Sequence, residues 1–226
     1  LSQLVSSMKD SNGKITINGF YDDVEDLTEE DRNDIARVPY DEEAYKEELK
    51  VDELHGEEGY STRERLWARP TLDVNGIFGG YQGMGSKTVH PSEASVKITC
   101  RLVSDQNPEI IYDLICKHVE ENLPVGVKSE VKRLAGSADP FVMPRSHNAN
   151  QVAREVLQEV YEMDPYVTRL GGSIPIMTIF LKELGVYGTM FGFSVGDENL
   201  HAPNEFFRLK NFRRGQEAYC KLFERL

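Results

Sequence analysis

The spacing of hydrophobic residues predicts short helices and strands through the first 135 residues. Apolar side chains recur at helical spacing near the N-terminus, and strict alternation over ten residues marks the clearest strand of the chain, at 94–103. The helix after that strand starts near Pro108 and carries its apolar residues on one face. The predicted elements in chain order are a helix at 1–9, strands at 14–17, 72–78 and 94–103, the helix from Pro108 and a strand at 125–134.

A polar segment, at about residues 19–70, interrupts this pattern. Thr28 and the acidic residues after it make a plausible helix start, and residues 40–54 have a helix-forming composition. We expect a surface insertion with two or three helices. The remaining order of helices and strands suits a two-layer α+β domain, in which helices cover one face of an antiparallel sheet.

A stretch rich in Gly, Ala and Pro, at 136–145, predicts a boundary between two parts, residues 1–135 and 136–226. The second part holds helical patterns around a single apolar strand, which is half of an α/β layer and too little to close a core. The predicted elements of this part are helices at 149–161, 175–184 and 205–226 and a strand at 186–193.

The net charge of −12 is concentrated in one segment. Residues 22–58 hold 17 Asp and Glu against 4 Lys and Arg, so the rest of the chain is close to neutral. This distribution argues against nucleic acid as a partner, because phosphate binding needs a basic face. The acidic segment either attracts cationic ligands or forms a solvated helical surface, and the second interpretation is favoured.

Composition and cysteine spacing indicate a globular protein of a reducing compartment. The chain is 39% hydrophobic and 28% charged, and no run approaches the roughly 18 apolar residues of a membrane helix. Cys100, Cys116 and Cys220 are odd in number and far apart, so we expect buried free thiols and a cytoplasmic location. The N-terminus lacks an initiator Met and resembles the middle of a helix, which indicates a piece of a longer chain.

His201 is the histidine whose surroundings favour chemistry. It follows the predicted strand at 186–193 and a polar loop, and ligands gather at the C-terminal ends of α/β strands, where an imidazole can reach a metal. The alternative is a loop histidine that caps the next helix. The five histidines form no HExxH, HxxEH or HxH pattern, so spacing alone predicts no complete metal site.

Two further places could bind a carboxylate. Gly172 and Ser173 precede Pro175, and exposed amides with a hydroxyl at a helix N-terminus form an anion site, although a tight turn with an N-cap serine fits equally well. Arg101, in the strand at 94–103, is either a solvated residue or a clamp for a substrate carboxylate. A nucleophilic role for Ser173 is disfavoured, because the order is not GxSxG and no triad partner is placed.

Several strings, in a consistent order over nearly the whole chain, resemble one enzyme family. They are SNGKITINGFYDD, RPTLDVNGIFGGYQGMGSKTVHPSEASVKITCRLV, RLGGSIPI and LHAPNEF. They are similar to the dinuclear-zinc exopeptidases and amidohydrolases that include carnosine dipeptidases, aminoacylases and succinyl-diaminopimelate desuccinylase, with the dipeptidase branch as the best match. The resemblance implies that residues 1–135 are a ferredoxin-like lid and dimerisation domain without its first strand. Residues 136–226 would then be the C-terminal portion of the α/β catalytic domain.

The resemblance also assigns roles to five residues. His201 inherits the role of a zinc ligand, and Arg101 that of binding the substrate carboxylate. Ser173, with Gly172 beside it, is expected against the same carboxylate. Thr88 matches a lid position that reaches the active site, often that of the partner subunit.

The implied function is zinc-dependent hydrolysis of the amide bond of a dipeptide or N-acyl amino acid by metal-activated water, in a homodimer formed through the lid. The family's HxD string, bridging aspartate and glutamate pair with the general base have no counterpart in this chain. One histidine cannot hold two zinc ions, so we expect the chain alone to be inactive and the other ligands to lie upstream. The alternative is a non-enzymatic dimerisation or binding module that keeps the lid fold. A serine hydrolase ranks third.

Overall fold

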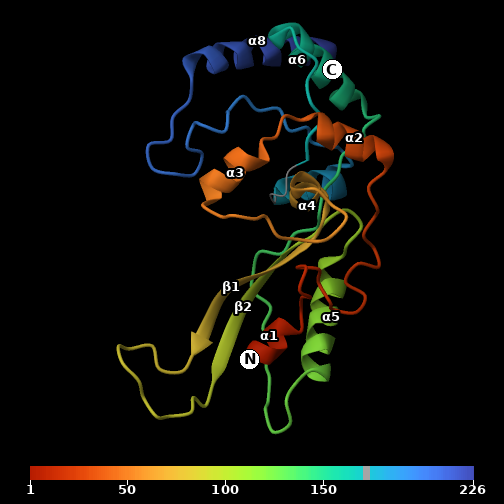
Figure 1. The fold of residues 1–226 in the computed structure, drawn as a ribbon. Helices are drawn as coiled ribbons and strands as arrows, with labels where there is room; N and C mark the ends of the chain where they lie inside the picture. Colours follow the sequence, from red (N-terminus) through yellow and green to blue (C-terminus); the bar gives the residue numbers. More distant parts are fainter. Residues whose placement is uncertain (170–173) are drawn as a thin grey trace. The chain divides into compact units, whose positions relative to one another are not determined.

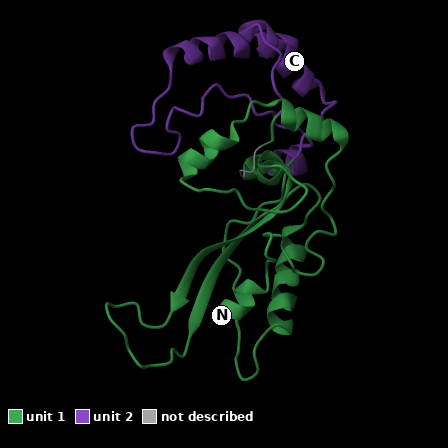
Figure 2. Ribbon diagram, viewed as in Figure 1, with its two compact units in different colours: residues 1–141, 168–178 green, residues 142–167, 179–226 purple. Residues whose placement is uncertain are grey.

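The computed structural model describes residues 1–169 and 174–226 and divides the chain into two compact units, coloured separately in Figure 2. Each unit has its own cluster of buried hydrophobic side chains. Within the described residues, no helix is long and apolar enough to cross a membrane. Unit 1 comprises residues 1–141 and 168–178, and unit 2 comprises residues 142–167 and 179–226.

Unit 1 is built on an antiparallel hairpin of two strands, β1 (Thr71–Gly79) and β2 (Ala94–Arg101) (Figure 1). The pairing shifts by one residue between Val74 and Gly76, which is a β-bulge that bends the ribbon. Half-buried and exposed positions alternate along most of β2. The strand predicted from alternation at 94–103 is therefore confirmed as far as Arg101, and one face of the hairpin is free to pack on a core.

That core lies between the hairpin, the N-terminal segment and helix α5 (Pro108–Glu121). Helix α5 begins where Pro108 predicts, and the Asn107 side chain accepts hydrogen bonds from two backbone N–H groups of its first turn. The Gln106 side chain is buried and donates to the carbonyl oxygen of Phe20 at 2.8 Å. The buried hydrophobic residues of this core are Met8, Ile15, Ile17, Phe20, Leu72, Ile111 and Val119.

The polar insertion forms three short helices, as predicted: α2 (Glu29–Arg37), α3 (Glu42–Leu49) and α4 (Thr62–Ala68). Helices α2 and α4 both begin with a capping box, in which a hydroxyl side chain and a carboxylate three residues later bond to each other's backbone N–H groups. The Arg32 guanidinium of α2 pairs with the buried Glu64 carboxylate of α4, with 2.8 Å between Nη1 and Oε1. The insertion is therefore an ordered part of unit 1.

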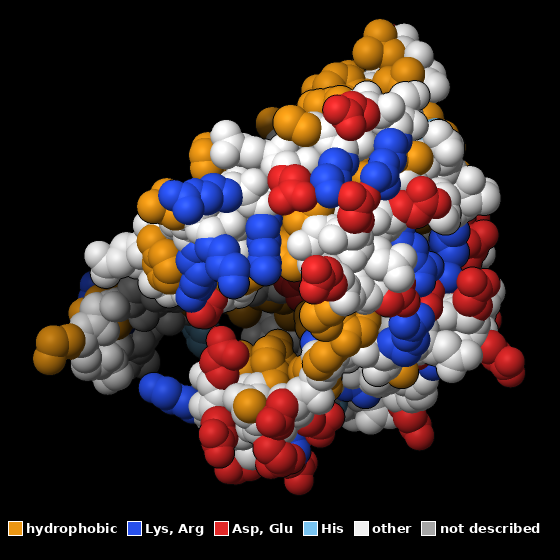
Figure 3. Space-filling view, turned by 90° about the horizontal axis from the view of Figure 1, so that it is seen from above, with side chains coloured by type: hydrophobic (Ala, Val, Ile, Leu, Met, Phe, Trp, Pro, Cys, Tyr) orange, Lys and Arg blue, Asp and Glu red, His pale blue; other side chains and the backbone are white. Residues whose placement is uncertain are grey.

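Unit 2 centres on two helices that pack against each other, α6 (Asn148–Tyr161) and α8 (Leu209–Arg225). Phe191 and Phe193 pack beside this pair, and the Tyr219 hydroxyl donates to the carbonyl oxygen of Phe191 at 2.6 Å. Large apolar residues of α8 also reach the surface, and Figure 3 shows apolar side chains exposed among charged ones. The buried residues of this core are Val152, Ala153, Val156, Ala218 and Leu222.

Two predicted strands are not strands in the structure. Residues 125–134 have no regular secondary structure; the Tyr112 hydroxyl of α5 donates to the carbonyl oxygen of Val131 at 3.1 Å, and Val131 packs on the core of unit 1. Residues 186–193 are also irregular. In the described parts of the chain, neither segment pairs with a neighbouring strand, and without such pairing an apolar pattern does not make a strand.

Other predicted elements are present with shorter bounds. The N-terminal helix is α1 (Ser2–Ser6), and the strand at 14–17 is reduced to one antiparallel bridge between Lys9 and Ile15. The helix predicted at 175–184 is split into α7 (Pro175–Ile179) and a π-helical turn. Unit 1 is thus a small α+β unit with a two-stranded antiparallel sheet.

Candidate functional site

His201 lies in an irregular loop between residues 195 and 208 of unit 2. Its side chain is exposed, and its backbone is left-handed, with φ at +62°. Asn199 and Asn204 also have positive φ values, of 53° and 62°, so the chain turns sharply on both sides of the histidine. Arg208 is the N-cap residue of α8. The alternative in which His201 caps that helix is therefore wrong, and its imidazole is presented to solvent.

Glu198 holds this loop and was missed by the sequence analysis. Its side chain is only 1% exposed, although it sits in a loop. One carboxylate oxygen accepts the backbone N–H of Val195 at 3.1 Å, and the other accepts the backbone N–H of Arg208 at 3.0 Å. Burial would raise the pKa of Glu198, but these hydrogen bonds and the Arg208 guanidinium hold the pKa below its ordinary value. The carboxylate is therefore charged at neutral pH and joins the two ends of the loop.

Arg101 and Thr88 lie toward opposite ends of the hairpin. Arg101 ends β2, where it pairs with Thr71, and its side chain is exposed. Thr88 is exposed in the loop at 80–93 that follows β1 at the other end (Figure 1). The seven residue steps from Arg101 to the start of β2 span roughly 23 Å, at about 3.3 Å per residue. Figure 1 shows the loop continuing away from the Arg101 end, so the hairpin does not bring these two residues together.

Gly172 and Ser173 lie outside the described residues. On their N-terminal side, the Arg169 guanidinium pairs with the Asp31 carboxylate at 2.9 Å. On their C-terminal side, helix α7 starts at Pro175, as predicted from the proline at the first turn. The ion pair therefore joins Arg169 to the start of helix α2 in the acidic insertion.

The described residues do not form a complete metal site. Among them, no group of three or more His, Cys, Asp or Glu side chains could hold a metal ion. The His118 ring is buried and lies 2.9 Å from the Ser7 hydroxyl, and the His147 ring accepts the backbone N–H of Ala149 at the start of α6. His201, with its exposed imidazole, fits the chemistry of one zinc ligand, but the described part of the chain does not supply a full ligand set.

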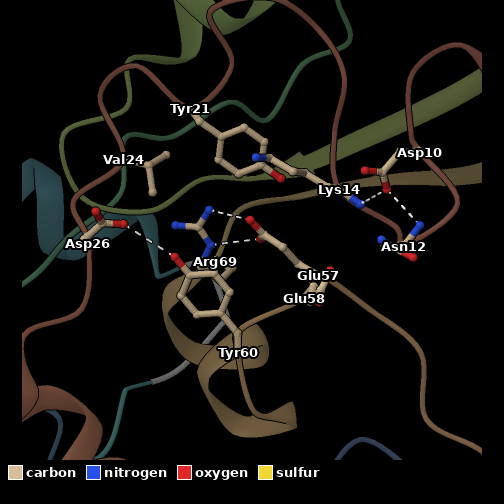
Figure 4. Close-up of a pocket in the computed structure, with 10 residues that line it drawn as sticks. All are labelled: Asp10, Asn12, Lys14, Tyr21, Val24, Asp26, Glu57, Glu58, Tyr60 and Arg69. Atoms are coloured by element: carbon tan, nitrogen blue, oxygen red, sulfur yellow. Dashed lines mark hydrogen bonds and ion pairs between the residues drawn. The ribbon is translucent and has the colours of Figure 1, made fainter.

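A cavity of about 500 Å³ opens in unit 1, and it differs from the predicted site (Figure 4). Figure 4 shows Arg69 between the rings of Tyr21 and Tyr60, with the guanidinium 5.0 and 4.4 Å from their centres. Arg69 also donates to both oxygens of Glu57, at 2.7 and 2.9 Å. None of the described residues predicted for the site lines this cavity. The opposite charges of Arg69 and Glu57 neutralise each other. We therefore interpret these residues as a structural cluster that holds the insertion together, not as a ligand site.

The three cysteines are free thiols, but they are less buried than predicted. Cys100 and Cys116 are half-buried, and Cys220 is exposed because it lies on the solvent side of α8. Burial raises the pKa of the Cys100 thiol to about 11. A thiol with such a pKa stays protonated at neutral pH and is a poor nucleophile.

Comparisons with known proteins agree with the resemblance seen in the sequence. A family model described as the peptidase dimerisation domain matches residues 1–127. The Cys-Gly metallodipeptidase of Saccharomyces cerevisiae is 31% identical over 96% of this chain and 46% of its own length. The Beta-Ala-His dipeptidase of Rattus norvegicus is 27% identical over 99% of this chain and 46% of its own length.

Solved structures of metallopeptidases also superpose on this chain. An M20 family metallo-carboxypeptidase from Sulfolobus solfataricus superposes with a TM-score of 0.85 at 29% identity, over 99% of this chain and 51% of that one. Human carnosine dipeptidase 1 superposes with a TM-score of 0.76 at 26% identity, over 98% of this chain and 47% of that one. The chain thus spans about half the length of the proteins it matches. Because the family model covers more than half of its residues, this chain belongs to the peptidase dimerisation-domain family of the M20 metallopeptidases.

Proposed function

We propose that the complete natural protein is a zinc-dependent dipeptidase or N-acyl-amino-acid hydrolase, to which this chain contributes the lid and the C-terminal part of the catalytic domain. The observation that carries the proposal is the continuous similarity of 95–99% of this chain to Cys-Gly and Beta-Ala-His dipeptidases. Within the proposal, residues 1–135 are the ferredoxin-like lid and residues 136–226 are the catalytic part. The three free thiols support a reducing, cytoplasmic location.

Each predicted site residue has a defined task in this proposal. His201 is one donor to a two-zinc centre, whose other ligands come from residues that this chain does not contain. Bound zinc would polarise the scissile carbonyl and lower the pKa of an attacking water. Arg101 orients the substrate through its terminal carboxylate, with Ser173 and Gly172 against the same group. This chain alone is then inactive.

The geometry of the hairpin supports a role for Thr88 in a second subunit. Arg101 lies at one end of the hairpin and Thr88 beyond the other end, so the two residues do not face one small substrate within a single hairpin. The family's description names a dimerisation domain, and a homodimer formed through the lid would bring the loop of one copy to the other copy. The proposal therefore assigns Thr88 to the active site of the partner subunit.

The test is hydrolysis of dipeptides by the complete natural protein, with and without a zinc chelator, and on dipeptides whose C-terminal carboxylate is amidated. Arg101→Ala should raise KM for the free acids by about tenfold or more and change the amides little, because one charge-assisted carboxylate contact is lost. Lys97→Ala, which removes an exposed cation four residues away on the same strand, is the matched control. An equal rise in KM for the free acids and the amides would refute the assignment of Arg101 to the substrate carboxylate.

Absence of chelator-sensitive hydrolysis by the complete protein would refute the enzymatic proposal itself. The remaining hypothesis would then be a dimerisation or binding module that keeps the lid. Sedimentation of the protein as a dimer without bound zinc would support that second hypothesis.

A further inference from the structure

We propose that Glu198 is a positioning residue for His201, because it clasps the two ends of the loop at 195–208 and so holds the imidazole in one orientation. This inference rests on the proposed function, in which His201 binds zinc. It concerns a residue to which no role follows from the sequence motifs, and it depends only on contacts within unit 2.

The first argument is the burial of a charged group in a loop. Acidic side chains are almost never fully buried unless their oxygens are paired, because burial of an unpaired carboxylate costs several kcal/mol in solvation. Glu198 is 1% exposed, yet each of its oxygens has a donor from a different end of the loop, Val195 and Arg208. The burial is therefore tolerated only while both ends of the loop stay in place.

The second argument is that the backbone of Glu198 adds to the same closure. Its carbonyl oxygen accepts the N–H of Phe206 at 3.1 Å, and its own N–H donates to the carbonyl oxygen of Val195 at 3.1 Å. The Arg208 guanidinium also donates to the carboxylate at 3.3 Å. One residue thus bonds to both ends of the loop through its main chain and its side chain.

The third argument is the left-handed backbone at the tip. His201, Asn199 and Asn204 all have positive φ, which is uncommon among L-residues although Asn and His adopt it more readily than most, so the tip makes sharp turns on both sides of the histidine. Ala202 donates its N–H to the carbonyl oxygen of Asn199 across this tip at 2.9 Å. Closing the base of the loop limits the backbone conformations available to the tip. The clasp therefore stabilises the conformation in which the His201 imidazole faces solvent.

A loop that is already held in one conformation is preorganised for metal binding. A ligand on a loop with many conformations loses entropy when it binds a metal, whereas a loop already held in one conformation loses less. Residues that orient a metal ligand without touching the metal commonly change metal affinity by 10- to 100-fold. Glu198 acts through the backbone of His201's loop, so we expect an effect near the lower end of this range.

Asp197 provides a matched control for charge. It receives two hydrogen bonds from the Arg208 guanidinium, at 2.6 and 2.8 Å, but its side chain is 71% exposed. Asp197→Asn weakens an exposed ion pair next to Glu198 and leaves the bonds from Val195 and Arg208 to Glu198 intact. Glu198→Gln keeps the size of the side chain but replaces one acceptor oxygen with a donor, so one end of the loop is released.

Val156→Ala provides the control for simple loss of stability. Val156 is fully buried in the core of unit 2 and lies on helix α6, outside the loop at 195–208, so its truncation lowers the melting temperature without removing a bond of the clasp. A purely structural role for Glu198 predicts that both variants change zinc affinity in proportion to their loss of stability. The positioning role predicts that only Glu198→Gln does.

The experiment measures zinc affinity by chelator competition and amide hydrogen exchange at 195–208, in the complete protein. Glu198→Gln should weaken zinc binding by about tenfold and speed exchange of the Val195 or Arg208 amide, whichever loses its acceptor oxygen. Asp197→Asn and Val156→Ala should change zinc affinity by less than about twofold. Unchanged affinity and exchange in Glu198→Gln, or an equal loss of affinity in Val156→Ala, would overturn the inference.

A His201→Ala variant separates this inference from the proposed function. If His201→Ala leaves zinc content unchanged, the ligand assignment fails, and the positioning role fails with it. If His201→Ala loses zinc while Glu198→Gln binds normally, the ligand assignment stands and only the positioning role is wrong.

Discussion

Unit 1 and unit 2 each bury a small hydrophobic cluster, but they differ in what surrounds it. In unit 1, two paired strands and helix α5 enclose the core, and the Arg69–Glu57 ion pair, with side chains only 8% and 11% exposed, joins two parts of the insertion beside Tyr21, which packs on that core. In unit 2, two helices enclose the core, and Glu159 of α6 pairs with Lys221 and Arg225 of α8 at the surface.

The comparison shows that the helices and the irregular segments of this chain are held by different interactions, the former by apolar packing and the latter by buried charged groups. Helices α5, α6 and α8 follow from amphipathic patterns, and their apolar faces pack into the cores of the two units. The irregular segments are placed by buried charged groups: Glu57 with Arg69 in unit 1, and Glu198 in unit 2. The candidate zinc ligand lies on a segment of this second kind.

The largest effect is expected from breaking the buried pair of unit 1. Arg69→Met leaves the Glu57 carboxylate buried without its partner and removes the contacts with Tyr21 and Tyr60, so the free energy of unfolding should fall by about 3 to 5 kcal/mol. Urea denaturation measures this change. The double variant with Glu57→Gln should recover part of the loss, because the uncompensated charge is gone. A loss below about 1 kcal/mol in the single variant would show that the pair is no stronger than a surface pair.

Matched truncations of one leucine in each core give the next largest effect. Leu72 is 1% exposed between the hairpin and α5, and Leu222 is 6% exposed between two helices. Leucine-to-alanine changes in cores cost about 2 to 5 kcal/mol, and less where neighbours can collapse into the space. We expect Leu72→Ala to destabilise more than Leu222→Ala in thermal and urea unfolding. The reverse order would mean that the helix pair of unit 2 is the more rigidly packed core.

The smallest effect is the acid sensitivity of the helix pair in unit 2. Hydrogen bonds from Lys221 and then Arg225 hold the pKa of Glu159 below its ordinary value. Because the folded pKa is the lower one, this contribution to stability is complete above about pH 4.3, the ordinary value for a glutamate, and is lost as pH falls through the folded pKa.

Glu159→Gln should therefore lower the melting temperature slightly at neutral pH. Between about pH 6 and pH 3, calorimetry should show the melting temperature of the variant falling less steeply with pH than that of the parent. Glu224→Gln, at an exposed glutamate of the other helix of the pair, α8, controls for the loss of one negative charge. An unchanged acid slope in Glu159→Gln would show that the surface pairs do not connect α6 and α8 energetically.

The sequence predicted the elements whose signals are local. Pro108 and the apolar face behind it located α5, alternation located β2, and the helix-forming composition of the acidic segment indicated its helices. Residues 125–134 and 186–193 were predicted wrongly as strands, because the apolar pattern of a segment says nothing about whether a neighbour offers it hydrogen bonds.

Of the candidate site, the sequence located His201 in its loop but not the group that holds it. No local pattern identifies Glu198, because its bonds to Val195 and Arg208 depend on how a loop folds back on itself. Arg101 and Thr88 were assigned by resemblance, and only the register of the hairpin reveals how far apart they lie.

Zinc stoichiometry of the complete natural protein, measured together with dipeptide hydrolysis in the parent and in His201→Ala, tests the central claim most directly. The account predicts about two zinc ions per protomer and chelator-sensitive hydrolysis in the parent, and loss of at least one zinc ion with most of the activity in His201→Ala. A parent protein that holds no zinc and hydrolyses no dipeptide, or a His201→Ala variant with full zinc content and activity, would contradict it.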